Sequence, residues 1–192
     1  MKTFKFAETS VFLHNEDLPD LLDYADEIGV DTETTGLNLS RDRLCLIQIG
    51  ISRNECHLVK FDKSEFQKEG KYKNLVNLLN NKQIKKIFHY ARFDLAVIKK
   101  FLKINCDNIF CTKIASKLVR TYTDRHGLKD LCKEILDIDL NKSQQSSDWS
   151  ASDLSKTLSI MESISSSSRE VLLNQIKTNA AMIEAAGVAP AL

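Results

Sequence analysis

The chain has 192 residues, of which 43% are hydrophobic and 28% are charged, and its formal net charge is +1 at pH 7. These values predict one globular domain with a sizeable core, and a net charge so close to zero names no partner by itself. The five cysteines are odd in number and form no C-x-x-C pair, which argues against a disulfide framework and a zinc ribbon.

Charge is distributed unevenly along the chain. Residues 1–30 carry seven acids against two lysines, a net charge of −5, and residues 82–133 carry thirteen Lys or Arg against four Asp, a net charge of +9. A basic middle segment can attract a polyanion. Lysine-rich helix faces in contact with water explain the same pattern, so charge alone does not decide between the two interpretations.

The sequence also bears on compartment and cofactors. No apolar run approaches membrane-spanning length, and residues 1–7 lack the apolar core of a signal peptide. We therefore expect no membrane contact and a cytoplasmic protein with reduced cysteines. Neither a G-x-G-x-x-G nor a Walker A motif occurs, so we expect no nucleotide cofactor.

The first third of the chain predicts mainly strands. Residues 3–6 alternate as an early strand would, and Asp17 or Asp20 can cap a helix that runs through residues 21–28. Three more strands are expected at 29–33, 44–51 and 56–59, and their short connections favour an antiparallel or mixed meander.

The pattern then changes to helices alternating with strands. Apolar residues recur at helical spacing in 75–79 and 93–102, with a short strand at 84–89 between them. A brief extended piece at 109–110 precedes helices near 112–121 and 127–137, and two more helices are expected at 153–163 and 169–185. The order predicts an α/β domain with a mixed sheet flanked by helices.

Two acids lie two residues apart in V-D-T-E-T-T-G-L, residues 30–37. In a strand, residues i and i+2 face the same way, so Asp31 and Glu33 point together and Thr32 points to the other face. Aligned carboxylates stay ionised together only with a cation between them, and hard oxygen ligands select Mg²⁺ or Mn²⁺. The alternative is a strand end at which both acids face water.

Two nearby features favour the metal site. Gly36 permits a turn that brings the backbone and Leu37 close to a ligand. Asp94 lies in the first turn of a predicted helix, directly after a strand, in F-H-Y-A-R-F-D-L, residues 88–95. The alternative for Asp94 is an acid that the helix macrodipole favours at this position.

These segments, taken in order, resemble the DEDD superfamily of 3′-5′ exonucleases. D-T-E-T-T-G-L and H-Y-A-R-F-D are similar to its first two motifs. R-D-R-L-C-L-I-Q-I (41–49), the stretch 111–132 and Q-Q-S-S-D-W (144–149) resemble ribonuclease D, above all the short bacterial ribonuclease D-like proteins that consist of the exonuclease domain alone. The resemblance covers about residues 5–156 and implies a ribonuclease H-like fold.

The resemblance implies that two metal ions, Mg²⁺ or Mn²⁺, assist hydrolysis of the last phosphodiester bond. By motif position, the catalytic metal ligands would be Asp31, Glu33 and Asp94. The substrate contacts implied in the same way are Thr34, Leu37, Gln48 and His89. Tyr90 stands where many relatives have Asn.

A late motif that the resemblance predicts is missing. Neither Tyr-x-x-x-Asp nor His-x-x-x-x-Asp occurs after residue 149, because the last Tyr, His and Asp are Tyr122, His126 and Asp153. The motif would orient the attacking water and complete a metal site, so its loss weakens the second site. Glu162 shares a helix face with position 165, where the Asp is expected, and is the candidate substitute.

The resemblance stops near residue 158, where the composition becomes serine-rich. We therefore divide the sequence into an exonuclease domain, 1–157, and a divergent helical tail, 158–192. An altered reading frame or a replaced C-terminus would produce this change, and so would ordinary divergence.

The sequence thus predicts a metal-dependent 3′-5′ exonuclease that removes nucleotides from the 3′ ends of single-stranded RNA. Two alternatives stay open: a catalytically impaired relative that only binds nucleic acid, and an exonuclease that acts on DNA. The sequence does not determine the oligomeric state.

Overall fold

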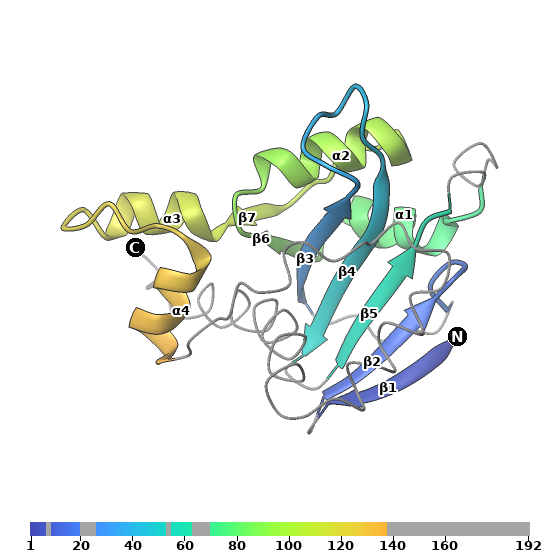
Figure 1. Ribbon diagram of the computed structural model, residues 1–192, viewed down its shortest axis with the longest axis horizontal. Helices are drawn as coiled ribbons and strands as arrows, with labels where there is room; N and C mark the ends of the chain where they lie inside the picture. Colours follow the sequence, from blue (N-terminus) through green and yellow to red (C-terminus); the bar gives the residue numbers. More distant parts are fainter. Residues whose placement is uncertain (7–8, 20–25, 53–54, 63–69, 138–192) are drawn as a thin grey trace.

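A computed structural model of the protein describes residues 1–6, 9–19, 26–52, 55–62 and 70–137 (Figure 1). The strands in these ranges are β1 (Lys2–Phe6), β2 (Thr9–His14), β3 (Glu27–Thr34), β4 (Leu44–Ser52), β5 (Glu55–Lys60), β6 (Lys85–Phe88) and β7 (Ile109–Cys111). The helices are α1 (Lys73–Asn80), α2 (Arg92–Leu102), α3 (Thr112–Val119) and α4 (Leu128–Leu136). The predicted tail, with its two helices and Glu162, lies outside the described residues.

The strands form one mixed sheet in the order β1-β2-β5-β4-β3-β6-β7. Strands β3, β4 and β5 make the antiparallel meander that the sequence predicts. Strand β6 then pairs parallel with β3, and β7 pairs parallel with β6, so the three strands end at the same edge of the sheet. The prediction of an α/β domain with a ribonuclease H-like mixed sheet is confirmed.

The main core lies between one face of the sheet and helices α1 and α2. Alternate residues of the central strands point to this face, and the core residues they contribute are Ile28, Val30, Ile47, Ile49 and Val59. Leu75 and Leu79 of α1 and Val97 and Ile98 of α2 cover them at helical spacing. The intervening residues of the strands, including Asp31 and Glu33, therefore point to the opposite face.

The sequence interpretation misses one strand, and most of the helix that it expects at 21–28 lies outside the described residues. Strand β2 was not predicted, since its three consecutive apolar residues, Val11 to Leu13, hide the alternation of a strand. Ile28, expected at a helix end, lies in β3. The carboxylate of Asp17 accepts the backbone N–H groups of Asn74 and Leu75 at the start of α1, 2.6 and 3.0 Å away, a role that the sequence interpretation did not include. A capping residue this far from its helix in the chain leaves no recognisable motif next to the helix in the sequence.

Arg120 connects α3 to α4. Its buried guanidinium forms an ion pair with Glu134 of α4 and donates to Ser116 Oγ at 3.0 Å and to the carbonyl oxygen of Arg125 at 2.7 Å. None of the helices in the described ranges is both long and apolar enough to cross a bilayer.

We expect Arg120→Ala to lower the free energy of unfolding by about 2 kcal/mol, because it removes the buried guanidinium that bonds the Ser116 hydroxyl, the Arg125 carbonyl and Glu134. Urea denaturation followed by circular dichroism measures the change. Arg125→Ala is the matched control, since the described contacts of this exposed residue use its backbone: the carbonyl accepts from Arg120 and the N–H donates to Thr123. Equal stability of the two variants would contradict a structural role for the Arg120 side chain.

Candidate active site

The candidate site lies where β3, β6 and β7 end together. The chain leaves β6 into α2 and leaves β7 into α3, so both helices begin at this edge of the sheet (Figure 1). In α/β sheets, ligands bind beside the carboxyl ends of parallel strands. Asp31 and Glu33 lie in the last half of β3, next to this edge.

The register of the strands places polar side chains in a row beside Asp31. Asp31 is paired with Gln48 of β4, and on the other side of β3 the pairing with β6 ends at Gly29–Ile87, two residues before Asp31. Paired neighbours point to the same face of a sheet. The amide Nε2 of Gln48 donates to Glu33 Oε1 at 3.3 Å, which confirms that Gln48 and Glu33 share this face.

Asp94 reaches the same acids from the helix-covered side. It is 6% exposed in the first turn of α2, and its Oδ1 accepts the hydroxyl of Thr32 at 2.6 Å. The backbone N–H of Thr32 also donates to this carboxylate. Strand β6 pairs with β3 only along Glu27–Gly29, so the carboxylate of Asp94 takes the position that a longer neighbouring strand would fill.

The charges of the three acids act on one another. Burial raises the pKa of Glu33 to about 8, with further contributions from the charges of Asp31 and Asp94, and the Gln48 hydrogen bond opposes them. Burial and the charge of Asp31 raise the pKa of Asp94 to about 7, against the hydrogen bonds from Thr32. A cation beside the carboxylates would remove this repulsion.

The chemistry of these donors fits a hard divalent cation, because all three are carboxylates. Their positions are not yet those of ligands: in the ranges that the structure describes, no three His, Cys, Asp or Glu side chains meet closely enough to hold a metal ion. Glu33 is bonded to Gln48, and Asp94 to Thr32. Binding of a cation would therefore draw the carboxylates away from these partners.

His89 and Tyr90 follow β6 directly. The Nδ1 atom of His89 lies 2.9 Å from Thr112 Oγ1, and burial together with the charge of Lys113 lowers the pKa of His89 to about 4. Tyr90 is 52% exposed, has a left-handed backbone with φ of 67°, and carries Lys113 Nζ at 4.3 Å from its ring centre. A neutral imidazole, an exposed ring and a cation thus lie together where β6 and β7 end.

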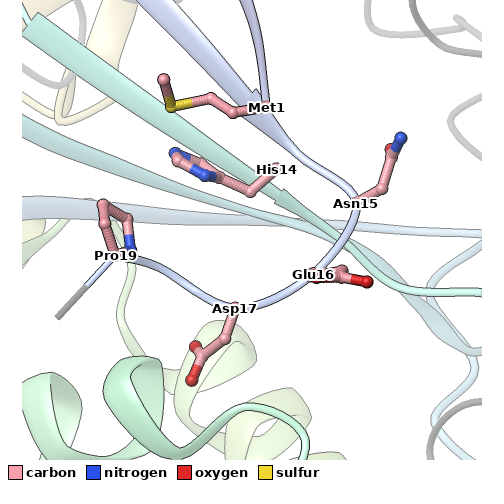
Figure 2. A pocket seen from close by; sticks show the side chains of 6 residues that line it. All are labelled: Met1, His14, Asn15, Glu16, Asp17 and Pro19. Carbon is pink, nitrogen blue, oxygen red and sulfur yellow. The ribbon is translucent and has the colours of Figure 1, made fainter.

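A separate pocket is a poor candidate for phosphate binding. It has a volume of about 530 Å³ and is lined by Met1, His14, Asn15, Glu16, Asp17 and Pro19. Figure 2 shows Glu16 and Asp17 on the loop that follows β2, with His14 at the strand end. Among the described residues, the lining includes two acids and neither Lys nor Arg, so these side chains do not favour a polyanion.

A family model described as 3′-5′ exonuclease matches residues 11–160. The chain belongs to the 3′-5′ exonuclease family. The resemblance found in the motifs of the sequence is thereby confirmed, and the match includes Asp31, Glu33 and Asp94.

Solved structures of exonucleases are similar to the chain over most of its length. The structure of Brucella melitensis NrnC with bound Mg²⁺ is 41% identical, with a TM-score of 0.70, and the match covers 92% of this chain and 82% of that one. A structure of the same protein bound to pGG is also 41% identical, with a TM-score of 0.71 and coverage of 94% and 84%.

Two more distant exonuclease relatives are similar in part. Escherichia coli RNase D is 22% identical with a TM-score of 0.56, covers 86% of this chain and 42% of that one, and supports the fold alone. DNA polymerase I of Aquifex aeolicus is 33% identical over 126 residues, which are 66% of this chain. The match spans only 19% of the length of that polymerase.

The remaining positions implied by the exonuclease motifs lie in the turn after β3. Thr34 Oγ1 donates to the carbonyl oxygen of Gly36 at 2.7 Å, and the Leu37 side chain is 82% exposed. The structure thus brings Gln48 to Glu33, lets the charges of the three acids act on one another and places Leu37 on the next turn, while His89 contacts Thr112. Their roles toward a substrate stay predictions. The sequence interpretation did not identify Thr32 and Thr112 as partners, since they contact residues 62 and 23 positions away.

We expect Gly36→Ala to distort the turn after β3 and to lower the affinity for a substrate about tenfold. The protein should stay folded. A Cβ at Gly36 would lie 2.4 Å from Asp42 Oδ2, and that carboxylate holds the turn by accepting the N–H of Asn38 at 2.9 Å. Fluorescence anisotropy with a labelled RNA measures the affinity. The control Ser40→Ala changes an exposed side chain on the same loop, and equal affinities in both variants would refute the expectation.

Proposed function

We propose that the chain is a Mg²⁺- or Mn²⁺-dependent exonuclease that removes nucleotides from the 3′ ends of RNA. One observation carries the proposal: burial and the charges of Asp31, Glu33 and Asp94 on one another raise the pKa values of Glu33 and Asp94. Membership of the exonuclease family supports it, as does the likeness to NrnC structures with Mg²⁺ and with pGG.

A cation held by Asp31, Glu33 and Asp94 would supply a Lewis acid for attack on the phosphodiester bond. The other residues of the chain bind and orient. Gln48 and Thr32 fix the side chains of Glu33 and Asp94 by hydrogen bonds. Lys113, which lies close enough to His89 to lower its pKa, places a positive charge where a phosphate backbone would approach.

A trimming assay tests this function. Purified protein is incubated with 5′-labelled single-stranded RNA, with pGG and with a DNA oligonucleotide, each with Mn²⁺, with Mg²⁺ and with EDTA. We expect RNA and pGG to be shortened from the 3′ end with either metal and not with EDTA. Faster shortening of DNA than of RNA would favour a DNA exonuclease instead.

A second candidate function is binding of nucleic acid without hydrolysis. The observation in its favour is the missing late motif, since the sequence has no Tyr-x-x-x-Asp or His-x-x-x-x-Asp after residue 149. RNA that is retained by the protein but not shortened in Mn²⁺ would support this candidate. If shortening occurs, Glu162→Gln tests whether that residue replaces the absent acid.

We also infer a reducing compartment such as the cytoplasm. All five cysteines are free thiols in the structure: Cys45, Cys56, Cys106, Cys111 and Cys132. Burial raises the pKa values of Cys56, Cys106 and Cys132 to about 12, 11 and 11, which keeps these thiols protonated and unreactive.

A further inference from the structure

The β3–β4 turn, residues 35–43, is held in shape by its own hydrogen bonds. The carbonyl oxygen of Asn38 accepts the N–H of Asp42 at 2.7 Å, and the Asp42 carboxylate accepts the N–H of Asn38 at 2.9 Å. At the base of the turn, the N–H of Thr35 donates to the carbonyl oxygen of Arg43, and the N–H of Arg43 donates to the Thr35 hydroxyl, both at 3.0 Å. Bonds that close on themselves in this way keep the turn together as one unit, whose place in the molecule depends on what it is fixed to.

Lys100, in the last turn of α2, fixes this unit to the helix. Its ammonium group donates a hydrogen bond to the carbonyl oxygen of Leu39, and Figure 1 shows the turn beside α2. The hydrogen bond from Arg41 lowers the pKa of Asp42, and the charge of Lys100 contributes in the same direction, so the ammonium group also lies near this carboxylate. The half-buried side chain of Lys100 thus directs its charge into the turn.

The same helix is bonded to β3 at its other end. In the first turn of α2, the carboxylate of Asp94 accepts the hydroxyl of Thr32 at 2.6 Å. A helix is stiff over so short a length, because its backbone hydrogen bonds run along its axis. Helix α2 therefore connects a carboxylate of the acidic cluster to the turn that carries Leu37, whose side chain is 82% exposed. The bond from Lys100 opposes a shift of the turn relative to the acids.

We propose that Lys100 is a positioning residue of the exonuclease site, which fixes the β3–β4 turn relative to the three acids and so keeps Leu37 in place beside the end of the substrate. The inference rests on the proposed function and adds a residue outside its motifs. Because the turn binds and the acids react, a displaced turn should weaken binding and leave the chemistry of the acids unchanged. The alternative is direct contact of this lysine with a phosphate, and its bond to Leu39 argues against that, since the bond uses the ammonium group within the protein.

Lys100→Met tests the proposal, because it keeps the apolar stem of the side chain and removes the ammonium group. With 5′-labelled single-stranded RNA and Mn²⁺, we expect KM to rise about tenfold while kcat stays within about twofold. Lys100→Arg keeps a charged donor and should recover most of the loss. The matched control Lys99→Met removes the same charge from an exposed neighbour in the same turn of α2 and should change both values by less than about twofold. Equal effects of Lys99→Met and Lys100→Met would overturn the proposal.

The salt dependence of binding separates positioning from direct phosphate contact. Each phosphate that a protein neutralises on a single strand contributes about −0.7 to the slope of the logarithm of affinity against the logarithm of salt concentration. Fluorescence anisotropy of labelled RNA in Ca²⁺ measures this slope. We expect Lys100→Met to bind more weakly at every salt concentration with an unchanged slope. A slope that becomes shallower by the contribution of one phosphate would overturn the proposal.

A double-mutant cycle with Leu37→Ala shows whether Lys100 acts through the turn. Lys100→Met should weaken binding about tenfold in the wild type and less than about twofold in the Leu37→Ala background. Losses that multiply independently would overturn the proposal. Circular dichroism checks that each variant is folded, and Lys100→Gln takes the place of Lys100→Met in the cycle if the latter is not.

The affinities in Ca²⁺ also separate this inference from the proposed function. Weaker binding by Lys100→Met, with no hydrolysis by the wild type in Mn²⁺, would refute the exonuclease activity and leave the positioning role intact. Hydrolysis by the wild type, with an unchanged KM in Lys100→Met, would refute the positioning role alone.

Discussion

Asp31→Asn is expected to reduce the rate of Mn²⁺-dependent RNA shortening about a thousandfold, the effect of losing roughly 4 kcal/mol of transition-state stabilisation. Asp31 is the member of the cluster whose charge acts on both other acids, since it raises the pKa values of Glu33 and Asp94. A cation binding among them would depend on it most. Single-turnover rates with excess enzyme measure the loss, and Mn²⁺ affinity from electron paramagnetic resonance should fall in parallel.

The control for Asp31→Asn is Asp26→Asn, an exposed acid directly before the same strand. It removes one negative charge without changing the cluster, so its rate should stay within about twofold of the wild type. A similar loss in both variants would show that overall charge matters and not the cluster. A fully active Asp31→Asn would remove the basis for assigning the site to these acids.

Features of the site that depend on neighbouring residues could be predicted from the sequence, and contacts between residues far apart in the chain could not. The strand with Asp31 and Glu33 and the helix with Asp94 were predictable because hydrophobic periodicity and the motif lie within a few residues of each acid. The pairing of Thr32 with Asp94, and of Thr112 with His89, depends on the sheet order, which no local pattern records. The capping of α1 by Asp17 was missed because its partners lie far along the chain, whereas β2 was missed because its run of apolar residues hides the alternation of a strand.

Glu33→Gln is expected to stabilise the metal-free protein at alkaline pH, by about 2 kcal/mol at pH 9. The folded state raises the pKa of Glu33 from 4.5 to about 8, so between these values the folded protein keeps a proton that the unfolded chain releases. Stability therefore falls as the pH rises through this window, and the loss is complete above the folded pKa. Asp94, raised from 3.8 to about 7, adds a loss of the same sign.

Urea denaturation in EDTA at pH 6 and pH 9 tests this expectation. The wild type should be less stable at pH 9, and Glu33→Gln should show a smaller difference between the two values. The control Glu27→Gln lies on the same strand and loses an ion pair with Lys85, so it should be slightly less stable than the wild type. If added Mn²⁺ stabilises Glu33→Gln as much as the wild type, Glu33 is not a ligand.

The bond between Thr32 and Asp94 also makes the site observable without any substrate. The backbone N–H of Thr32 is directed at the carboxylate of Asp94, since β6 pairs with β3 only along Glu27–Gly29. A ligand that attracts this carboxylate would release the amide, and its exchange with deuterium would quicken while the rest of β3 stayed protected. The exchange rate of this one backbone amide thus reports whether a cation is bound at the three acids.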